Sequence, residues 1–246
     1  MIRWTFAHLV RQRRDVARAR EFWAAATGTR PSVQHGRDWT HTTLLPAGGD
    51  ACLGLLATGR GAGGDAASAE LPGVRLELAD DEPDRLAVRA RALGARVGPD
   101  GWLRSPAGQP FTVRGWRGER TPPPAPVRLG RVVLAVHTAG LAAELGFWSS
   151  LTGWDTLVAA GGRDHRLLAP APLPFDLSVR GLGAAGPYPA SASPALACDD
   201  PAATAALHRR LGAQVGPATC ADPTGAPYCL LAGGPQGPAA GRSDQA

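Results

Sequence analysis

The sequence predicts an α+β protein built from four βαβββ units, which are arranged as two tandem halves. The main observation is a duplication. The motif Phe-Trp-x-x-x-Thr-Gly at 22–28 returns 125 residues later at 147–153. Two further stretches repeat in the same order, since 93–99 resembles 211–217 and 105–111 resembles 222–228. A repeat of about one domain length indicates two related domains within the 246 residues.

Each half contains the same succession of a strand, a helix and short strands, and it does so twice. The predicted strands of the first half are runs of alternating or apolar residues between turn residues: 5–10, 38–45, 51–56, 73–78, 102–105 and 110–114. The predicted strands of the second half follow the same pattern: 131–136, 165–168, 175–180, 195–198 and 227–231.

The helices are marked by their ends. Asp15 is the predicted N-cap of the first helix and Gly28 its left-handed stop. The second helix is expected over 82–93, and the third carries the repeated Phe-Trp pair. Asp200 and the following proline open the fourth helix. The Phe-Trp pairs are expected to pack on a sheet as core residues.

A proline-rich stretch separates the halves, and it contains three consecutive prolines that favour a stiff spacer. The predicted boundaries are a first domain over 1–119, a linker over 120–127, a second domain over 128–236 and a flexible tail over 237–246.

Composition limits the classes of function. Hydrophobic residues make up 44% of the chain and charged residues 19%, so each half can form a core. The net charge is +5, all 26 basic residues are arginines, and these are scattered among acidic residues. We therefore expect neither a nucleic-acid partner nor a membrane partner. The expected oligomeric state is a monomer or a homodimer.

The four cysteines have no C-x-x-C spacing, which argues against a zinc ribbon or a redox motif. The first residues lack the features of a signal peptide, and no apolar run is long enough to span a bilayer. A cytoplasmic protein with free thiols is the expectation.

The ordered motifs of both halves resemble the vicinal oxygen chelate superfamily, in its glyoxalase-like and bleomycin-resistance-like branch. The resemblance rests on the Phe-Trp helix ending in Thr-Gly, an Asp-Asp before a helix, Leu-Gly-Ala at the next helix end, and a Pro-x-Gly-x-Pro-aromatic turn. It covers about nine-tenths of the chain and implies two curled mixed sheets. Enzymes of the superfamily, dioxygenases among them, hold a divalent metal with His, Glu or Gln from paired strands.

The resemblance places the metal-ligand positions of the first half at His8, near Val74 and at Thr112, and those of the second half at Val133, Ser193 and Cys229. Only His8 and Cys229 have ligand chemistry, and they belong to different halves. No metal or other cofactor is therefore expected, and a divalent metal remains the alternative. His8 is alternatively a buried structural histidine, and Cys229 a small buried residue.

Two hypotheses of function follow. The first is a metal-free binding protein that sequesters an aromatic metabolite or antibiotic. The second is an enzyme of lyase, isomerase or dioxygenase type, with His8 or His41 as acid, base or ligand. The candidate ligand-binding residues are polar or aromatic side chains of strand segments: Trp39, Arg75, Glu77, Trp102, Thr112, His165, Arg180, Ser193 and Cys229. Arg75 and Glu77 are either a binding pair or an exposed pair, and a surface role is favoured for His165.

Overall fold

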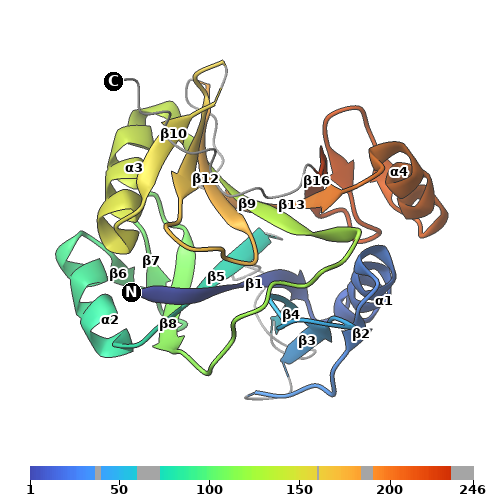
Figure 1. Ribbon diagram of the computed structural model, residues 1–246, viewed down its shortest axis with the longest axis horizontal. Coiled ribbons are helices and arrows are strands. Elements are labelled where there is room, and N and C mark those ends of the chain that lie inside the picture. The colour runs from blue at the N-terminus through green and yellow to red at the C-terminus, as the bar shows by residue number, and fades with distance from the viewer. Residues whose placement is uncertain (37–39, 60–72, 160, 184–190, 234–246) are drawn as a thin grey trace, which may run out of the picture.

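A computed structural model describes residues 1–36, 40–59, 73–159, 161–183 and 191–233. Over these ranges the chain forms four helices and two eight-stranded mixed sheets, one from each half (Figure 1). No helix of the described ranges is both long and apolar enough to cross a membrane. The predicted tail over 237–246 and the candidate residue Trp39 lie outside the described residues.

The first sheet has the strand order β2-β3-β4-β1-β5-β8-β7-β6. Its central pair, β1 and β5, is antiparallel, while β1 runs parallel to β4 and β5 runs parallel to β8. The elements of this half are β1 (Ile2–Gln12), α1 (Val16–Thr27), β2 (Arg30–Pro31), β3 (His41–Leu45), β4 (Leu53–Thr58), β5 (Gly73–Asp80), α2 (Pro83–Ala92), β6 (Arg96–Val97), β7 (Leu103–Arg104) and β8 (Pro110–Gly115).

The second sheet repeats this order with the equivalent strands, β10-β11-β12-β9-β13-β16-β15-β14. Its elements are β9 (Val127–His137), α3 (Thr138–Thr152), β10 (Asp155–Val158), β11 (Asp164–Leu168), β12 (Asp176–Leu182), β13 (Ser191–Cys198), α4 (Pro201–Arg210), β14 (Gln214–Val215), β15 (Cys220–Ala221) and β16 (Pro227–Ala232). The prediction of four βαβββ units in two curled mixed sheets is therefore confirmed. β9 begins at the last residue of the predicted linker.

Two of the three predicted capping residues are found. Gly28 ends α1 with a left-handed φ of 62°, and the side chain of Asp200 caps α4 by accepting a hydrogen bond from the N–H of Ala203. The prediction for Asp15 is wrong, because its side chain makes no cap hydrogen bond. Its backbone is already in the right-handed helical region, whereas an N-cap side chain reaches the first helical N–H groups from the extended region.

The two halves pack through their repeated Phe-Trp pairs. The ring of Trp23 on α1 lies 5.4 Å from that of Tyr228 on β16, and Phe22 lies 5.5 Å from His208 on α4. In the same way, Phe147 and Trp148 of α3 pack on Phe111 of β8, at 5.8 and 5.2 Å. Figure 1 accordingly shows α1 beside α4 on one side of the molecule and α2 beside α3 on the other.

The Phe-Trp pairs are core residues, as predicted, but they contact strands of the opposite half. A single hydrophobic cluster consequently includes buried residues of both halves. This packing fixes the helices on one face of each sheet. Strand alternation then directs every second side chain of the central strands to the opposite face, where the polar residues gather.

Candidate functional site

The face of the first sheet that points away from the hydrophobic cluster carries a group of polar and aromatic side chains. We call it the first polar face, and it comprises His8, His41, Arg75, Glu77, Trp102, Thr112 and Arg114. Strands β1, β3, β5 and β8 and the residue before β7 supply them. The intervening residues Val74, Leu76 and Leu78 of β5 are buried in the core.

The strand register defines the position predicted near Val74 more closely. His8 on β1 lies opposite Arg75 on β5, not opposite Val74. A shift of one residue moves a side chain to the other face of a sheet, and Val74 indeed points into the core. The position that pairs with His8 is thus occupied by an arginine.

Glu77 is the centre of the first polar face. Its Oε2 lies 3.3 Å from Nε2 of His8, and its Oε1 accepts a hydrogen bond from Nε of Arg114. Arg114 also donates to Oε1 of Glu119, at 2.6 Å. Burial opposes the charge on Glu77, but the hydrogen bonds from His8 and Arg114 outweigh it and lower its pKa to about 2. Glu77 is therefore a carboxylate with both oxygens engaged.

The sequence had indicated that His8 is isolated, but in the structure it has a carboxylate partner. The residue opposite Glu77 on β1 is Phe6, so His8 reaches the carboxylate diagonally across the strand pair. The partners are nearly seventy residues apart in the chain, and only the β1–β5 register brings them together. Arg114, which completes the cluster, was missed for the same reason.

Aromatic rings surround His8. Its ring lies edge-on to Trp102 at 5.7 Å and to His41 at 5.5 Å. The guanidinium of Arg75 stacks over Trp102 at 4.8 Å and pairs with Asp100 at 2.8 Å. Arg75 and Glu77 thus pair with different partners.

His41 is a partly buried histidine of the same face. Burial, followed by the nearby His8 and His35, lowers the pKa of His41. It is therefore neutral at neutral pH and can act as a hydrogen-bond acceptor or a base.

The candidate residues of the second half lie elsewhere. Ser193 and Cys229 share the corresponding face of the second sheet with Arg180, because Ser193 lies opposite Val133 and Cys229 opposite Ala195. His165 pairs with Val179, whose side chain is in the core, so it points to the other side of the sheet. Apart from His165, the predicted site residues that the structure describes thus form two separate groups, one in each half.

Comparisons with known proteins agree with this architecture. Residues 8–114 match the sequence model of the glyoxalase-like domain family. A halotolerant catechol dioxygenase superposes with a TM-score of 0.60 at 15% identity, over 95% of this chain and 87% of that one. The Mn(II)-bound glyoxalase from Novosphingobium aromaticivorans superposes with a TM-score of 0.58 at 16% identity, over the same shares. The chain has the vicinal oxygen chelate fold.

The family model matches only residues of the first half of the chain. A fusion of a xylose isomerase-like TIM barrel with 4-hydroxyphenylpyruvate dioxygenase also superposes, with a TM-score of 0.58 at 16% identity over 86% of this chain. The chain spans 38% of the length of that fusion protein. A search of curated protein sequences finds no match.

The fold implies a metal site, but the residues of the glyoxalase-like first half do not fit one. A divalent ion of this kind needs about three open N or O donors. Both oxygens of Glu77 are held by His8 and Arg114, and the paired positions carry Arg75 and the neutral hydroxyl of Thr112. Among the described residues no group of three His, Cys, Asp or Glu side chains could hold a metal ion.

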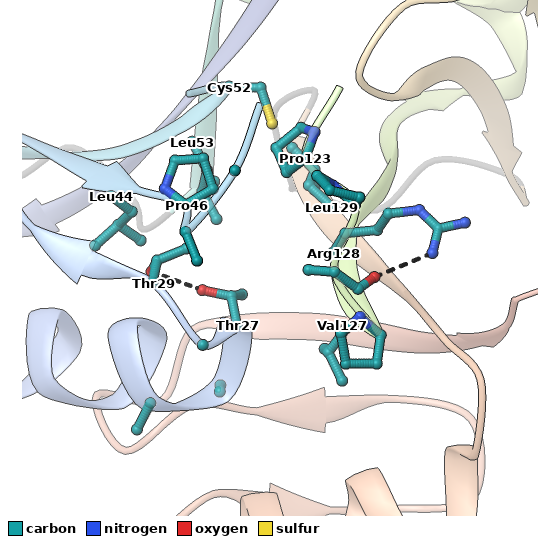
Figure 2. A pocket seen from close by; sticks show the side chains of 18 of the residues that line it. Thr27, Thr29, Leu44, Pro46, Cys52, Leu53, Pro123, Val127, Arg128 and Leu129 are labelled. Atoms are coloured by element: carbon teal, nitrogen blue, oxygen red, sulfur yellow. Dashed lines mark hydrogen bonds between the residues drawn. The ribbon is translucent and has the colours of Figure 1, made fainter. Parts of the chain in front are cut away.

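A separate apolar cavity of about 340 Å³ lies between the first half, the proline-rich segment and β9 (Figure 2). Its walls include Leu44 and Leu53, which alternate with the residues that face His8, so the cavity is on the other side of the first sheet. Few polar groups border it, among them Thr27 and Thr29, which hydrogen-bond to each other at 2.9 Å. Burial raises the pKa of Cys52 in its wall to about 12, which keeps this thiol unreactive.

Proposed function

We propose that this glyoxalase-like protein binds a small aromatic molecule at the first polar face, and that it does so without a metal ion. The observation that supports this is the state of Glu77, whose two oxygens are occupied by His8 and Arg114. Two of the metal-ligand positions that the superfamily resemblance implies, His8 and Thr112, lie on this face. What it offers a ligand is instead the ring of Trp102 and the neutral imidazole of His41.

The chemistry of these groups favours a flat ligand with a hydroxyl or amide group. Aromatic side chains contribute a large contact area with specific stacking geometry, and a neutral imidazole gives directional hydrogen bonds. The charges nearby are paired, since Arg75 lies on Asp100 and Arg114 on Glu77 and Glu119. A net-neutral lining selects for shape and stacking more than for charge. We place the protein in a reducing cytoplasm because its four cysteines are unpaired, and we expect a monomer or homodimer.

The test is a thermal-shift screen of the full chain against aromatic antibiotics, phenols and thiol adducts, followed by calorimetry on the best ligand. Trp102→Leu should weaken binding by about tenfold or more, because an aromatic contact is lost. Trp116→Leu is the matched control, since that ring lies against the guanidiniums of Arg3 and Arg120. Equal affinity in both variants would contradict the proposed site.

An enzyme is the second candidate, and the lowered pKa of the half-buried His41 is the observation that favours it. In that case His41, or His8 next to it, would move a proton during a lyase or isomerase reaction. Recovering the ligand after incubation distinguishes the two. An unchanged ligand supports binding alone, whereas a converted ligand, with conversion lost in His41→Ala, supports the enzyme.

A further inference from the structure

The second sheet has a polar face of a different composition. We call it the second polar face, and it comprises Arg131 on β9, Asp164 and Arg166 on β11, and Asp176, Ser178 and Arg180 on β12. The alternate residues Leu177 and Val179 are fully buried in the core on the side where α3 packs. These six polar side chains therefore point away from the helix side.

The charges on the second polar face do not balance. Asp164 accepts two hydrogen bonds from Arg180, at 2.5 and 3.0 Å, and Asp176 pairs with Arg166 at 2.5 Å. The two carboxylates are thus paired with the guanidiniums of Arg166 and Arg180, and no carboxylate of this face is paired with Arg131. Within the described ranges Arg131 has no ion pair or hydrogen bond through its side chain, and its Nε is buried without a partner.

Burial, and after it the charge of Arg166, lowers the pKa of Arg131, and the opposite charges of Asp176 and Asp164 offset this only in part. Burial and the charge of Arg166 disfavour the charged guanidinium in the free protein. A bound anion would reverse both, because it would supply an acceptor and a compensating charge.

A second orphaned group lies on the same face. Ser178 is fully buried, and its hydroxyl has no hydrogen-bond partner among the described residues. It lies directly opposite Arg166, whose Nε is also buried and unsatisfied. Buried polar atoms are satisfied in the great majority of cases, so several donors left open on one face indicate a missing acceptor.

The second polar face carries different residues from the first polar face at equivalent positions. By strand register, Arg131 takes the place of Phe6 and Ser178 takes the place of Gly54. Conversely, Val133 stands where the first half has His8. The duplicated sheets thus present an aromatic and histidine-rich face in one half and an arginine-rich face in the other.

We propose that the second polar face is a binding site for a small organic carboxylate, held by the guanidinium of Arg131 and the hydroxyl of Ser178. A guanidinium presents two parallel N–H donors that match the two oxygens of a carboxylate. Asp164 and Asp176 hold Arg180 and Arg166 in place, and they also exclude anions of higher charge. The site is independent of the one proposed for the first half.

The experiment is isothermal titration of the full chain with benzoate, and in parallel with inorganic phosphate, at constant ionic strength. Benzoate should bind, and Arg131→Gln should weaken its affinity by about tenfold or more, because a charge-assisted contact is lost. Arg210→Gln removes the same charge from an exposed arginine of α4 and should leave the affinity unchanged.

Ser178→Ala gives a readout that does not depend on the fate of Arg131. It should lower the affinity for benzoate and raise the melting temperature of the free protein, because it deletes a buried hydroxyl that has no partner. Equal benzoate affinity in Arg131→Gln and Arg210→Gln would overturn the proposal. So would tighter binding of phosphate than of benzoate, or a lower melting temperature of free Ser178→Ala.

Discussion

Replacing Asp222 by alanine is expected to lower the free energy of unfolding of the full chain by about 3–5 kcal/mol, as for other buried ion pairs that lose one partner. The side chain of Arg11, which is 2% exposed, would keep its charge in the core without a counterion. Chemical denaturation of the wild-type and variant chains measures the difference.

The size of this effect follows from the number of groups that Asp222 satisfies. Its Oδ2 accepts hydrogen bonds from Arg11 at 2.6 and 3.2 Å and from the indole N–H of Trp23 at 2.9 Å. Its Oδ1 accepts from Thr224 and from the N–H of Ala226, within the turn that enters β16. One carboxylate thus joins the first half to the last turn of the second.

Asp81→Ala is the matched control. Asp81 pairs with Arg3 at 2.8 Å, but both side chains are exposed, so the loss should be at most about 1 kcal/mol. Equal losses for the two variants would show that Arg11 is not held in the core as described.

The contribution of Asp222 also depends on pH in a defined direction. Burial opposes its ionisation, but the charge of Arg11 and the hydrogen bonds from Thr224 and Trp23 outweigh burial and lower its pKa. A lowered folded pKa adds stability above the unfolded value of about 3.9, and that stability is lost as the pH falls through the folded pKa. The gap between wild type and Asp222→Ala should therefore narrow below about pH 4.

Replacing Glu144 by alanine is expected to cost about 2–4 kcal/mol of unfolding free energy. Glu144 is fully buried on α3, and it accepts hydrogen bonds from Ser105 at 2.5 Å, Ala107 at 2.9 Å and Trp148 at 2.8 Å. Without it, three buried donors lose their acceptor, and each costs about 1–3 kcal/mol, offset in part by relaxation. Denaturant unfolding again provides the measurement.

Glu21→Ala, at an exposed position on α1, is the control for Glu144→Ala and should change stability by less than about 0.5 kcal/mol. If Glu144→Ala unfolded at the same denaturant concentration as Glu21→Ala, the described network around Glu144 would be wrong. If Glu144→Ala destabilised the protein as expected, one buried carboxylate at each end would be shown to stabilise the interface between the halves.

Asp222 and Glu144 show which parts of the interface between the halves the sequence repeat predicts and which it does not. The repeated turn has Ser105 in the first half and Asp222 in the second, so the repeat alone suggested equivalent turns. In the structure the carboxylate comes from the turn at one end of the interface, as Asp222, and from a helix at the other. There Glu144 on α3 accepts a hydrogen bond from Ser105. The sequence could predict that the Phe-Trp helices pack in a core, but not that they pack against the opposite half.

The candidate site was predictable in part. Alternation along single strands places Arg75 with Glu77 on one face, and this requires no knowledge of partners. The contacts of His8 with Glu77, and of Glu77 with Arg114, depend on the registers of three strands from distant parts of the chain. Periodicity fixes the face of a residue, whereas only the register of neighbouring strands identifies what lies beside it.

The central claim is that Glu77, His8 and Arg114 form a closed cluster in place of a metal site. The most direct measurement is calorimetric titration of the chelator-treated full chain with Mn²⁺ and with Zn²⁺, for the wild type and for His8→Ala. We predict no stoichiometric binding that depends on His8, so that the two proteins titrate alike. One equivalent of divalent ion per wild-type chain, with the affinity lost in His8→Ala, would contradict the account.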